Sequence, residues 1–144
     1  MFNTFRQFAV ALLFIFAAVT APPAAEPGPT EPAYLYRAIV VRVIDGDTID
    51  VDIDLGFYVW LKNQRIRLAG IDAPEMRGAE RTQGRRSATY LRSMIEGKEI
   101  ILKTIKGRDG ADRRGKFGRW IGRVYLDGQD INRHMIEAGH AKPY

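Results

Sequence analysis

A tight turn between two strand-like segments is the feature that most restricts how this chain can fold. Residues 36–44 are rich in Val and Ile, and residues 48–55 alternate strictly between apolar and acidic or polar positions. Asp45-Gly46 lies between them, and this dipeptide favours a hairpin because glycine adopts a positive φ angle at little cost. The alternation predicts that Ile49, Val51, Ile53 and Leu55 face a core. We interpret the opposite row (Asp50, Asp52, Asp54) as a solvated strand face rather than a second metal site.

The rest of the pattern predicts three further strands and two helices. The expected strands are residues 64–71, 99–105 and 119–126, and the expected helices are residues 82–96 and 130–138. Residues 57–61 extend the hairpin, and Lys62-Asn63 is a candidate turn before the third strand. The first helix has an apolar stripe (Ala88, Leu91, Met94, Ile95) and Gly97 at its end. Asp130 is the expected N-cap of the second helix.

The order of these elements is three strands, a helix, two strands and a helix. This order is typical of a mainly β, α+β architecture: a five-stranded Greek-key barrel of the OB type with two or three packed helices. OB barrels bind oligonucleotides over one face and its neighbouring loops. A β-meander with two packed helices is the alternative.

The first 34 residues differ from the rest of the chain. Arg6 precedes an uncharged run of 14 residues, Phe8–Ala21, and small residues follow. Residues 1–25 therefore resemble a signal peptide, because a membrane span needs about 20 apolar residues. We expect an exported protein, secreted or periplasmic; the alternative is an uncleaved membrane tether through residues 8–21. Residues 26–34 are predicted to be a proline-rich linker, and residues 35–144 the folded domain.

Composition excludes several classes of enzyme. The chain has 144 residues, no cysteine and two histidines, His134 and His140. A thiol nucleophile, a disulfide framework, a cysteine-ligated metal and a three-histidine zinc site are therefore excluded. Both histidines are interpreted as structural or surface residues. The net charge of +5 favours polyanionic partners, nucleic acid first and an acidic membrane surface second.

Two short segments, VIDGDT at 43–48 and RLAGIDAPE at 67–75, carry the chemistry. Asp47 and Asp72 can offer two carboxylates to a hard cation such as Ca²⁺ if their strands are neighbours. The carbonyl of Ala73 is free to join them, because Pro74 ends the regular strand. Strict alternation places Arg67 and Asp72 on opposite faces, so we expect a bend at Gly70.

These segments, with KFGR at 116–119, YLDG at 125–128 and NRHMIEAGHAK at 132–142, resemble the staphylococcal nuclease family over residues 36–144. The resemblance implies an OB fold and calcium-dependent hydrolysis of DNA and RNA with little sequence preference, preferring single strands and leaving 3′-phosphates. It implies that one Ca²⁺ is held by Asp47, Asp72 and the Ala73 carbonyl. By the same resemblance Glu75 is the general base that activates water, and Arg67 and Arg119 bind the scissile phosphate.

The resemblance and the charge pattern also indicate substrate-binding residues. Residues 103–119 contain seven basic and two acidic side chains, which favours a loop that follows phosphates over a merely solvated one. The candidate substrate-binding residues are Lys116, Phe117, Arg113, Arg114 and Tyr144. Phe117 stands where the family commonly has a tyrosine, and Ala73 where it often has threonine.

Several alternatives stay open at this point. Tyr58, Trp60 and Trp120 could stack on bases, although packing at the core or its edge is the favoured interpretation of the tryptophans. Further arginines (Arg77, Arg81, Arg85, Arg86) either contact nucleic acid or are solvated. We expect a monomer. The rival functions are a non-catalytic OB module that binds nucleic acid and an interaction domain that binds anionic lipid.

Overall fold

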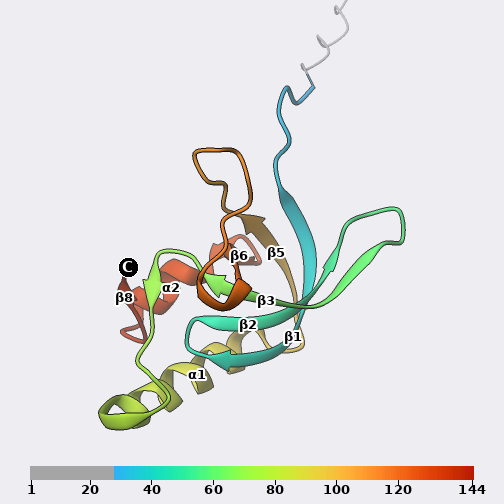
Figure 1. Ribbon diagram of the computed structural model, residues 1–144. Helices are drawn as coiled ribbons and strands as arrows, with labels where there is room; N and C mark the ends of the chain where they lie inside the picture. The colour runs from blue at the N-terminus through green and yellow to red at the C-terminus, as the bar shows by residue number, and fades with distance from the viewer. Residues whose placement is uncertain (1–27) are drawn as a thin grey trace, which may run out of the picture. The chain divides into compact units, whose positions relative to one another are not determined.

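Five strands close on themselves into a barrel (Figure 1). The computed structural model describes residues 28–144, of which Ala33–Tyr144 form one folded unit. The barrel strands are β1 (Leu35–Asp45), β2 (Thr48–Asp54), β3 (Trp60–Leu68), β5 (Glu99–Thr104) and β6 (Trp120–Leu126). They are neighbours in the order β3-β2-β1-β5-β6, and a parallel pairing of β3 with β6 closes the ring. The predicted five-stranded OB barrel is confirmed.

The remaining elements are short or helical. They are β4 (Ile71–Asp72), β7 (Gln129–Asp130), β8 (Lys142–Pro143), the 3-10 turns η1 (Gly78–Glu80) and η2 (Lys116–Gly118), α1 (Arg81–Ile95) and α2 (Ile131–Glu137). β4 pairs with β8 as a separate antiparallel ribbon, and β7 folds back to pair antiparallel with the end of β6. α1 packs against β1, and α2 packs against β6 and β4.

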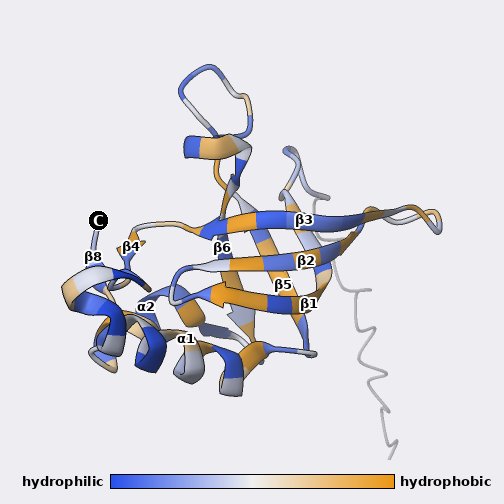
Figure 2. Ribbon diagram, turned by 60° about the horizontal axis from the view of Figure 1, so that its bottom comes forward, coloured by the Kyte–Doolittle hydropathy of each residue, from blue (hydrophilic) through white to orange (hydrophobic). Residues whose placement is uncertain are grey.

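The core fills the barrel and the space beneath the helices. Apolar residues alternate with polar ones along the barrel strands (Figure 2). The largest fully buried side chains include Ile49, Ile66, Leu68, Leu91, Ile95, Leu102 and Met135. The apolar stripe predicted for the first helix faces this core, with Ala88, Leu91 and Ile95 buried. As predicted, the Asp130 carboxylate caps α2 by accepting a hydrogen bond from the Arg133 N–H at 3.0 Å.

The turn predicted at Lys62-Asn63 is wrong. The chain reverses earlier, at residues 55–59, where Phe57 and Tyr58 both have positive φ angles and are almost fully exposed. Asn63 also has a positive φ, but it belongs to a β-bulge in the β2–β3 pairing. Asparagine tolerates this left-handed conformation in bulges as in turns, so its presence alone did not distinguish the two. The β2–β3 hairpin therefore projects well beyond the barrel (Figure 1).

The acidic row of β2 is not a simple solvated face. Asp50 is buried and accepts hydrogen bonds from Arg42 at 2.8 Å and Arg65 at 2.7 Å. The other two carboxylates also pair, Asp52 with Lys62 and Asp54 with Arg37. Neighbouring strands thus neutralise the row. Every carboxylate of the row is therefore paired with a cationic side chain.

The two tryptophans of the barrel strands are partly buried and lie against cationic side chains. Trp60 lies between two cations, with Lys62 at 4.9 Å and Arg37 at 5.8 Å from its ring centroid. Trp120 is half-buried against the core and is covered by Arg114 at 3.8 Å. The packing interpretation of both tryptophans is confirmed.

Residues 1–25, predicted to be a signal peptide or anchor, lie outside the described residues, as does the start of the predicted linker. Residues 28–34 are exposed and form no helix or strand. Within residues 28–144 no helix combines the length and the apolar character needed to span a membrane.

We expect Asp50→Asn to lower the free energy of unfolding by about 1.5 kcal/mol at pH 7, because its charge-assisted bonds are lost. Hydrogen bonds from Arg65 and then Arg42, with their charges, hold the pKa of Asp50 below its usual range despite burial. This stabilisation is full above the unfolded pKa of about 4 and disappears as pH falls through the lower folded pKa. Urea unfolding from pH 7 to pH 2 should therefore show the two proteins converging. A constant difference across this range would contradict the assignment.

Candidate active site

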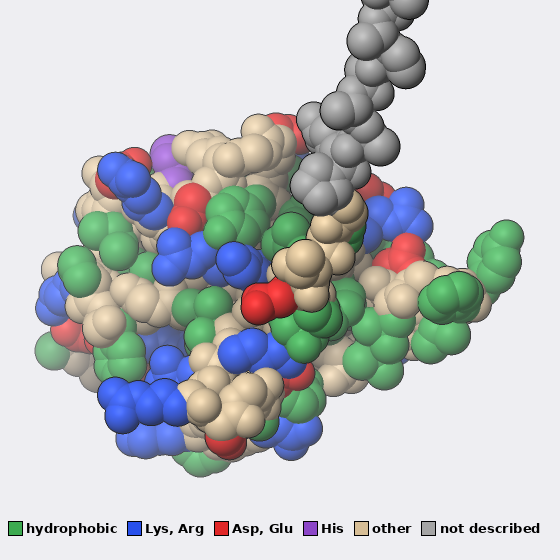
Figure 3. All heavy atoms as spheres, turned by 90° about the horizontal axis from the view of Figure 1, so that it is seen from above, with side chains coloured by type: hydrophobic (Ala, Val, Ile, Leu, Met, Phe, Trp, Pro, Cys, Tyr) green, Lys and Arg blue, Asp and Glu red, His purple; other side chains and the backbone are tan. Residues whose placement is uncertain are grey.

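An open groove of about 700 Å³ brings most of the predicted site residues together. Its lining includes Arg67, Asp72, Glu75, Arg113, Lys116, Phe117, Arg119 and Tyr144. It lies between the β3–β4 segment and the loop that joins β5 to β6. Figure 3 shows Lys and Arg side chains gathered on the face that this loop covers. Of the predicted set, Asp47, Ala73 and Arg114 do not line the groove.

Asp47 lies directly behind the groove at the β1–β2 turn. Its side chain is only 7% exposed. One oxygen, Oδ1, accepts a hydrogen bond from the Thr48 hydroxyl at 3.0 Å, and the other, Oδ2, accepts one from the Ala73 N–H at 2.8 Å. The second bond ties the β1–β2 turn to the segment that follows β4. Asp47 therefore fixes the place of Ala73.

Arg67 joins the two predicted metal carboxylates. Its guanidinium forms ion pairs with Asp47 and with Asp72, the latter at 3.0 Å. This contact requires the predicted bend, which is confirmed: β3 ends at Leu68, and Gly70 has a φ of +73° before β4 begins. Arg67 is 18% exposed and Asp72 is 55% exposed, so the pair marks the boundary between core and groove.

Glu75 is exposed in the groove, on the loop between β4 and α1. Its N–H donates to Glu80 Oε2 at 3.1 Å. Its carbonyl lies against Gly84 of α1, where a Cβ would come within 2.4 Å of the Glu75 oxygen. Gly84 therefore lets the loop lie close to α1 and so determines where Glu75 stands.

A second glycine holds the β1–β2 turn against the same helix. A Cβ on Gly46 would lie 2.0 Å from the Ser87 hydroxyl and 2.6 Å from the Ala73 Cβ. Ser87 in turn donates a hydrogen bond to the His140 carbonyl at 2.7 Å. The turn, the loop after β4 and the segment before β8 thus all meet on α1.

Arg119 reaches the site from the other side of the groove, at the end of η2. Its Nε donates to the Lys116 carbonyl at 3.1 Å, and one terminal nitrogen lies 3.4 Å from Thr48 Oγ1. Thr48 thus contacts both Asp47 and Arg119. Sequence reasoning quoted Thr48 within its motif but gave it no role. The strict order D-G-D-T was the signal that could have indicated one.

The predicted substrate-binding residues divide into two sets. Arg113, Lys116, Phe117 and Tyr144 line the groove, and the two aromatic rings are 94% and 90% exposed. Arg114 instead stacks on Trp120 at 3.8 Å and pairs with it as an isolated β-bridge. The backbone N–H of Tyr144 donates to the Gly70 carbonyl at 3.0 Å, which places this residue beside the bend.

Asn132 is a buried residue that supports the groove and that sequence reasoning did not single out. Its amide nitrogen donates to the Ala69 carbonyl at 2.9 Å, and its oxygen accepts the Val124 N–H at 3.0 Å. The side chain therefore ties the end of β3 to β6 from within. Asparagine inside a mostly apolar helix face was the only available signal.

Asp45 provides a further carboxylate behind the site. Its Oδ1 accepts a hydrogen bond from the Asp47 N–H at 3.0 Å. Burial raises the pKa of the Asp45 carboxyl, and a hydrogen bond from Thr48 and the charges of Arg67 and Arg119 oppose that rise. Asp45 thus holds the backbone of Asp47 in place, and its own carboxyl does not line the groove.

The donor set fits a hard cation bound partly by solvent. Within residues 28–144 no three acidic or histidine side chains are grouped to hold a metal alone. Asp47 and Asp72 are nevertheless brought to one guanidinium, and Ala73 directly follows Asp72. Two carboxylates and a carbonyl are oxygen ligands that Ca²⁺ accepts, with water completing six to eight positions. Sulfur and imidazole ligands are absent from this group of residues.

Comparison with known proteins gives a consistent picture. A family model described as "Staphylococcal nuclease homologue" matches residues 65–144. A protein of Escherichia coli O157:H7 named "Uncharacterized endonuclease" is 39% identical over 106 residues, which cover 73% of this chain and 59% of that protein. The chain thus spans about three-fifths of the length of this curated relative.

Two more distant relatives carry related names. Endonuclease YhcR of Bacillus subtilis is 29% identical over 129 residues, covering 83% of this chain and 10% of that protein. A protein of Oryza sativa named "Probable staphylococcal-like nuclease CAN2" is 32% identical over 83 residues, which cover 58% of this chain and 20% of that protein. The fold, the groove and the match over residues 65–144 lead to one conclusion: the chain belongs to the staphylococcal nuclease family.

Proposed function

We propose that this domain is a calcium-dependent nuclease that hydrolyses phosphodiester bonds in DNA and RNA with little sequence preference, leaving 3′-phosphates. One observation carries the proposal: a single groove is lined by Arg67, Arg119, Asp72 and Glu75, with the buried Asp47 directly behind it. Relatives named as endonucleases support it.

In this proposal the two arginines hold the scissile phosphate. Attack on a phosphodiester builds negative charge on the oxygens bound to phosphorus. A planar guanidinium can bond two such oxygens at once, and Arg67 and Arg119 both line the groove. Both are held in place before substrate arrives, Arg67 by carboxylates and Arg119 by the Lys116 carbonyl.

Glu75 is the proposed general base. It is exposed in the groove and carries no ion pair among residues 28–144, so its carboxylate is free to take a proton from the attacking water. The oxygen of the leaving nucleotide departs on the other side of the phosphorus. Asp47, Asp72 and the Ala73 carbonyl would hold Ca²⁺, which when bound supplies positive charge beside the phosphate.

Single strands are the proposed substrates. Phe117 and Tyr144 expose their rings at the groove, and such rings bind unpaired bases by stacking. Arg113 and Lys116 add charges that attract the backbone.

Removing the proposed base or one arginine should slow cleavage strongly with little effect on folding. We expect Glu75→Gln to lower kcat by about 10²- to 10⁴-fold, and Arg119→Ala to lower kcat by about 10²- to 10³-fold. The measurement is cleavage of heat-denatured DNA by the purified protein with excess Ca²⁺. Arg133→Gln, which removes an exposed charge from α2, is the matched control. Salt-sensitive DNA binding without cleavage by the unaltered protein would instead indicate a binding module.

Calcium binding should stabilise the fold through Asp72. At about 100 times its Kd, Ca²⁺ adds about 2.7 kcal/mol to the free energy of unfolding. Asp72→Asn should lose most of this gain, because one of two carboxylate ligands is gone. Asp127→Asn, in the exposed β6–β7 turn, should retain it. Urea unfolding with Ca²⁺ and with chelator measures both; equal stabilisation of the two variants would refute the ligand assignment.

We also propose that the domain acts after export, or tethered through residues 8–21, as a monomer. The charge and hydropathy pattern of residues 1–25 supports this location. Mass spectrometry of the protein purified from the organism that produces it should find that the mature chain starts near residues 22–26. Recovery of the intact chain from the membrane fraction would favour the tether, and recovery of the intact chain from the cytosol would contradict both.

A further inference from the structure

A second charged surface lies outside the groove, along the exposed face of α1. The helix carries four arginines and no acidic residue over its 15 positions. Arg92 pairs with Glu96, whereas Arg81, Arg85 and Arg86 form no ion pair within residues 28–144. Arg81 and Arg85 stand four residues apart, a spacing at which like charges destabilise a helix. The repulsion between these arginines lowers the stability of the helix, and no ion pair among the described residues offsets it.

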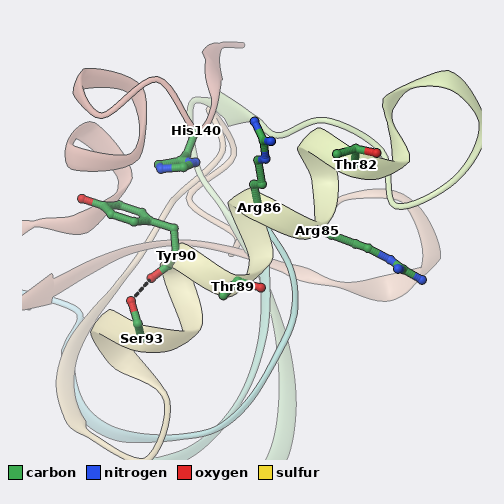
Figure 4. Close-up of a pocket in the computed structure, with 7 residues that line it drawn as sticks. All are labelled: Thr82, Arg85, Arg86, Thr89, Tyr90, Ser93 and His140. Carbon is green, nitrogen blue, oxygen red and sulfur yellow. Dashed lines mark hydrogen bonds between the residues drawn. The ribbon is translucent and has the colours of Figure 1, made fainter.

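This charged surface borders a hollow of about 620 Å³ with an aromatic side. Arg85, Arg86, Tyr90 and His140 line it together with the hydroxyl side chains of Thr82 and Thr89. The rings of Tyr90 and His140 are stacked, with centroids 4.1 Å apart. In Figure 4, Arg86 extends on the same side of the helix as His140, while Arg85 points away from the rings. Hydrogen-bond donors for phosphate thus adjoin a ring pair that can extend a stack of bases.

The hollow is linked to the catalytic groove through the β4–β8 ribbon. Arg86 and His140 also line a neighbouring hollow of about 360 Å³, together with Pro74 and Lys142. Asp72 pairs with Lys142 across the ribbon, and Asp72 lines the groove. Pro74 and Glu75, adjacent in sequence, thus belong to two sides of one ridge. A strand that leaves the groove over this ridge reaches Lys142, then Arg86 and the rings.

We propose that the α1 face is a second binding surface for the single-stranded nucleic acid that the groove cleaves, with Arg85, Arg86 and Lys142 on its phosphates and the His140–Tyr90 pair against a base. This rests on the proposed nuclease function and adds a length requirement to it. A dinucleotide fills only the groove, whereas a longer strand also contacts α1. An anionic membrane is the less favoured partner, because binding of lipid headgroups requires neither a ring pair for stacking nor a path that continues into the groove.

The test compares short and long substrates in an Arg85→Gln/Arg86→Gln variant of the full chain. Binding of a single-stranded oligonucleotide of about 30 nucleotides should weaken on the order of tenfold at 0.1 M salt. The slope of log K against log salt should fall by about 1.4, two contacts at about 0.7 each. Cleavage of a dinucleotide should not change. Arg92→Gln/Lys98→Gln removes the same charge at and just beyond the C-terminal end of α1 and should behave as the unaltered protein.

A second variant tests the rings separately. His140→Ala removes the outer ring of the stack while the Ser87 contact to its backbone carbonyl stays. It should weaken binding of the long strand severalfold, and an oligonucleotide with abasic sites should bind both proteins equally. Unchanged long-strand affinity and salt slope in the arginine variant would overturn the proposal. It would also be overturned if the arginine variant lost binding to anionic vesicles but kept its affinity for the long strand. Failure of the nuclease proposal is distinct: the unaltered protein would then cleave neither substrate, whatever its binding.

Discussion

The buried carboxylate of Asp47 is the point on which both barrel and site depend. A charge removed from water must be paired, and here the Thr48 hydroxyl, the Ala73 N–H and the Arg67 guanidinium supply the partners. These partners come from β2, from the segment after β4 and from β3. Pairing the buried Asp47 carboxylate therefore brings together the elements that form one wall of the groove. The same contacts therefore stabilise the fold and position the candidate site residues.

Local signals were sufficient for most of the fold. The Asp45-Gly46 turn, the alternation of β2 and the Asp130 cap each depend on residues close in sequence, and all three are present, except that Leu55 lies beyond the end of β2 and is exposed rather than in the core. The bend at Gly70 could be inferred because Arg67 and Asp72 would otherwise face apart. The bulge at Asn63 could not, because asparagine favours the same backbone conformation in a turn and in a bulge.

Features that depend on distant contacts escaped prediction. The pairing of Asp50 with Arg42 and Arg65 requires knowing that β1 and β3 flank β2 in register. Asn132 and Gly84 serve the site through contacts eight or more residues away in sequence, so their sequence surroundings carry little sign of the role. The basic loop lines the groove through Arg113 and Lys116, but Arg114 could not be separated from Arg113 without seeing Trp120. The family resemblance indicated the candidate site residues, and the structure shows which contacts hold them.

The contact between Gly46 and α1 has a consequence for motion. A single added carbon at Gly46 would overlap the Ser87 hydroxyl, so the turn that carries Asp47 is packed directly against the helix. Ser87 and Gly84 connect the same helix to the His140 carbonyl and to the Glu75 backbone. Partial opening of α1 would therefore displace Asp47, Glu75 and the β4–β8 ribbon at once. The site and the helix therefore form one cooperative unit, in which local unfolding of any part disrupts the entire site.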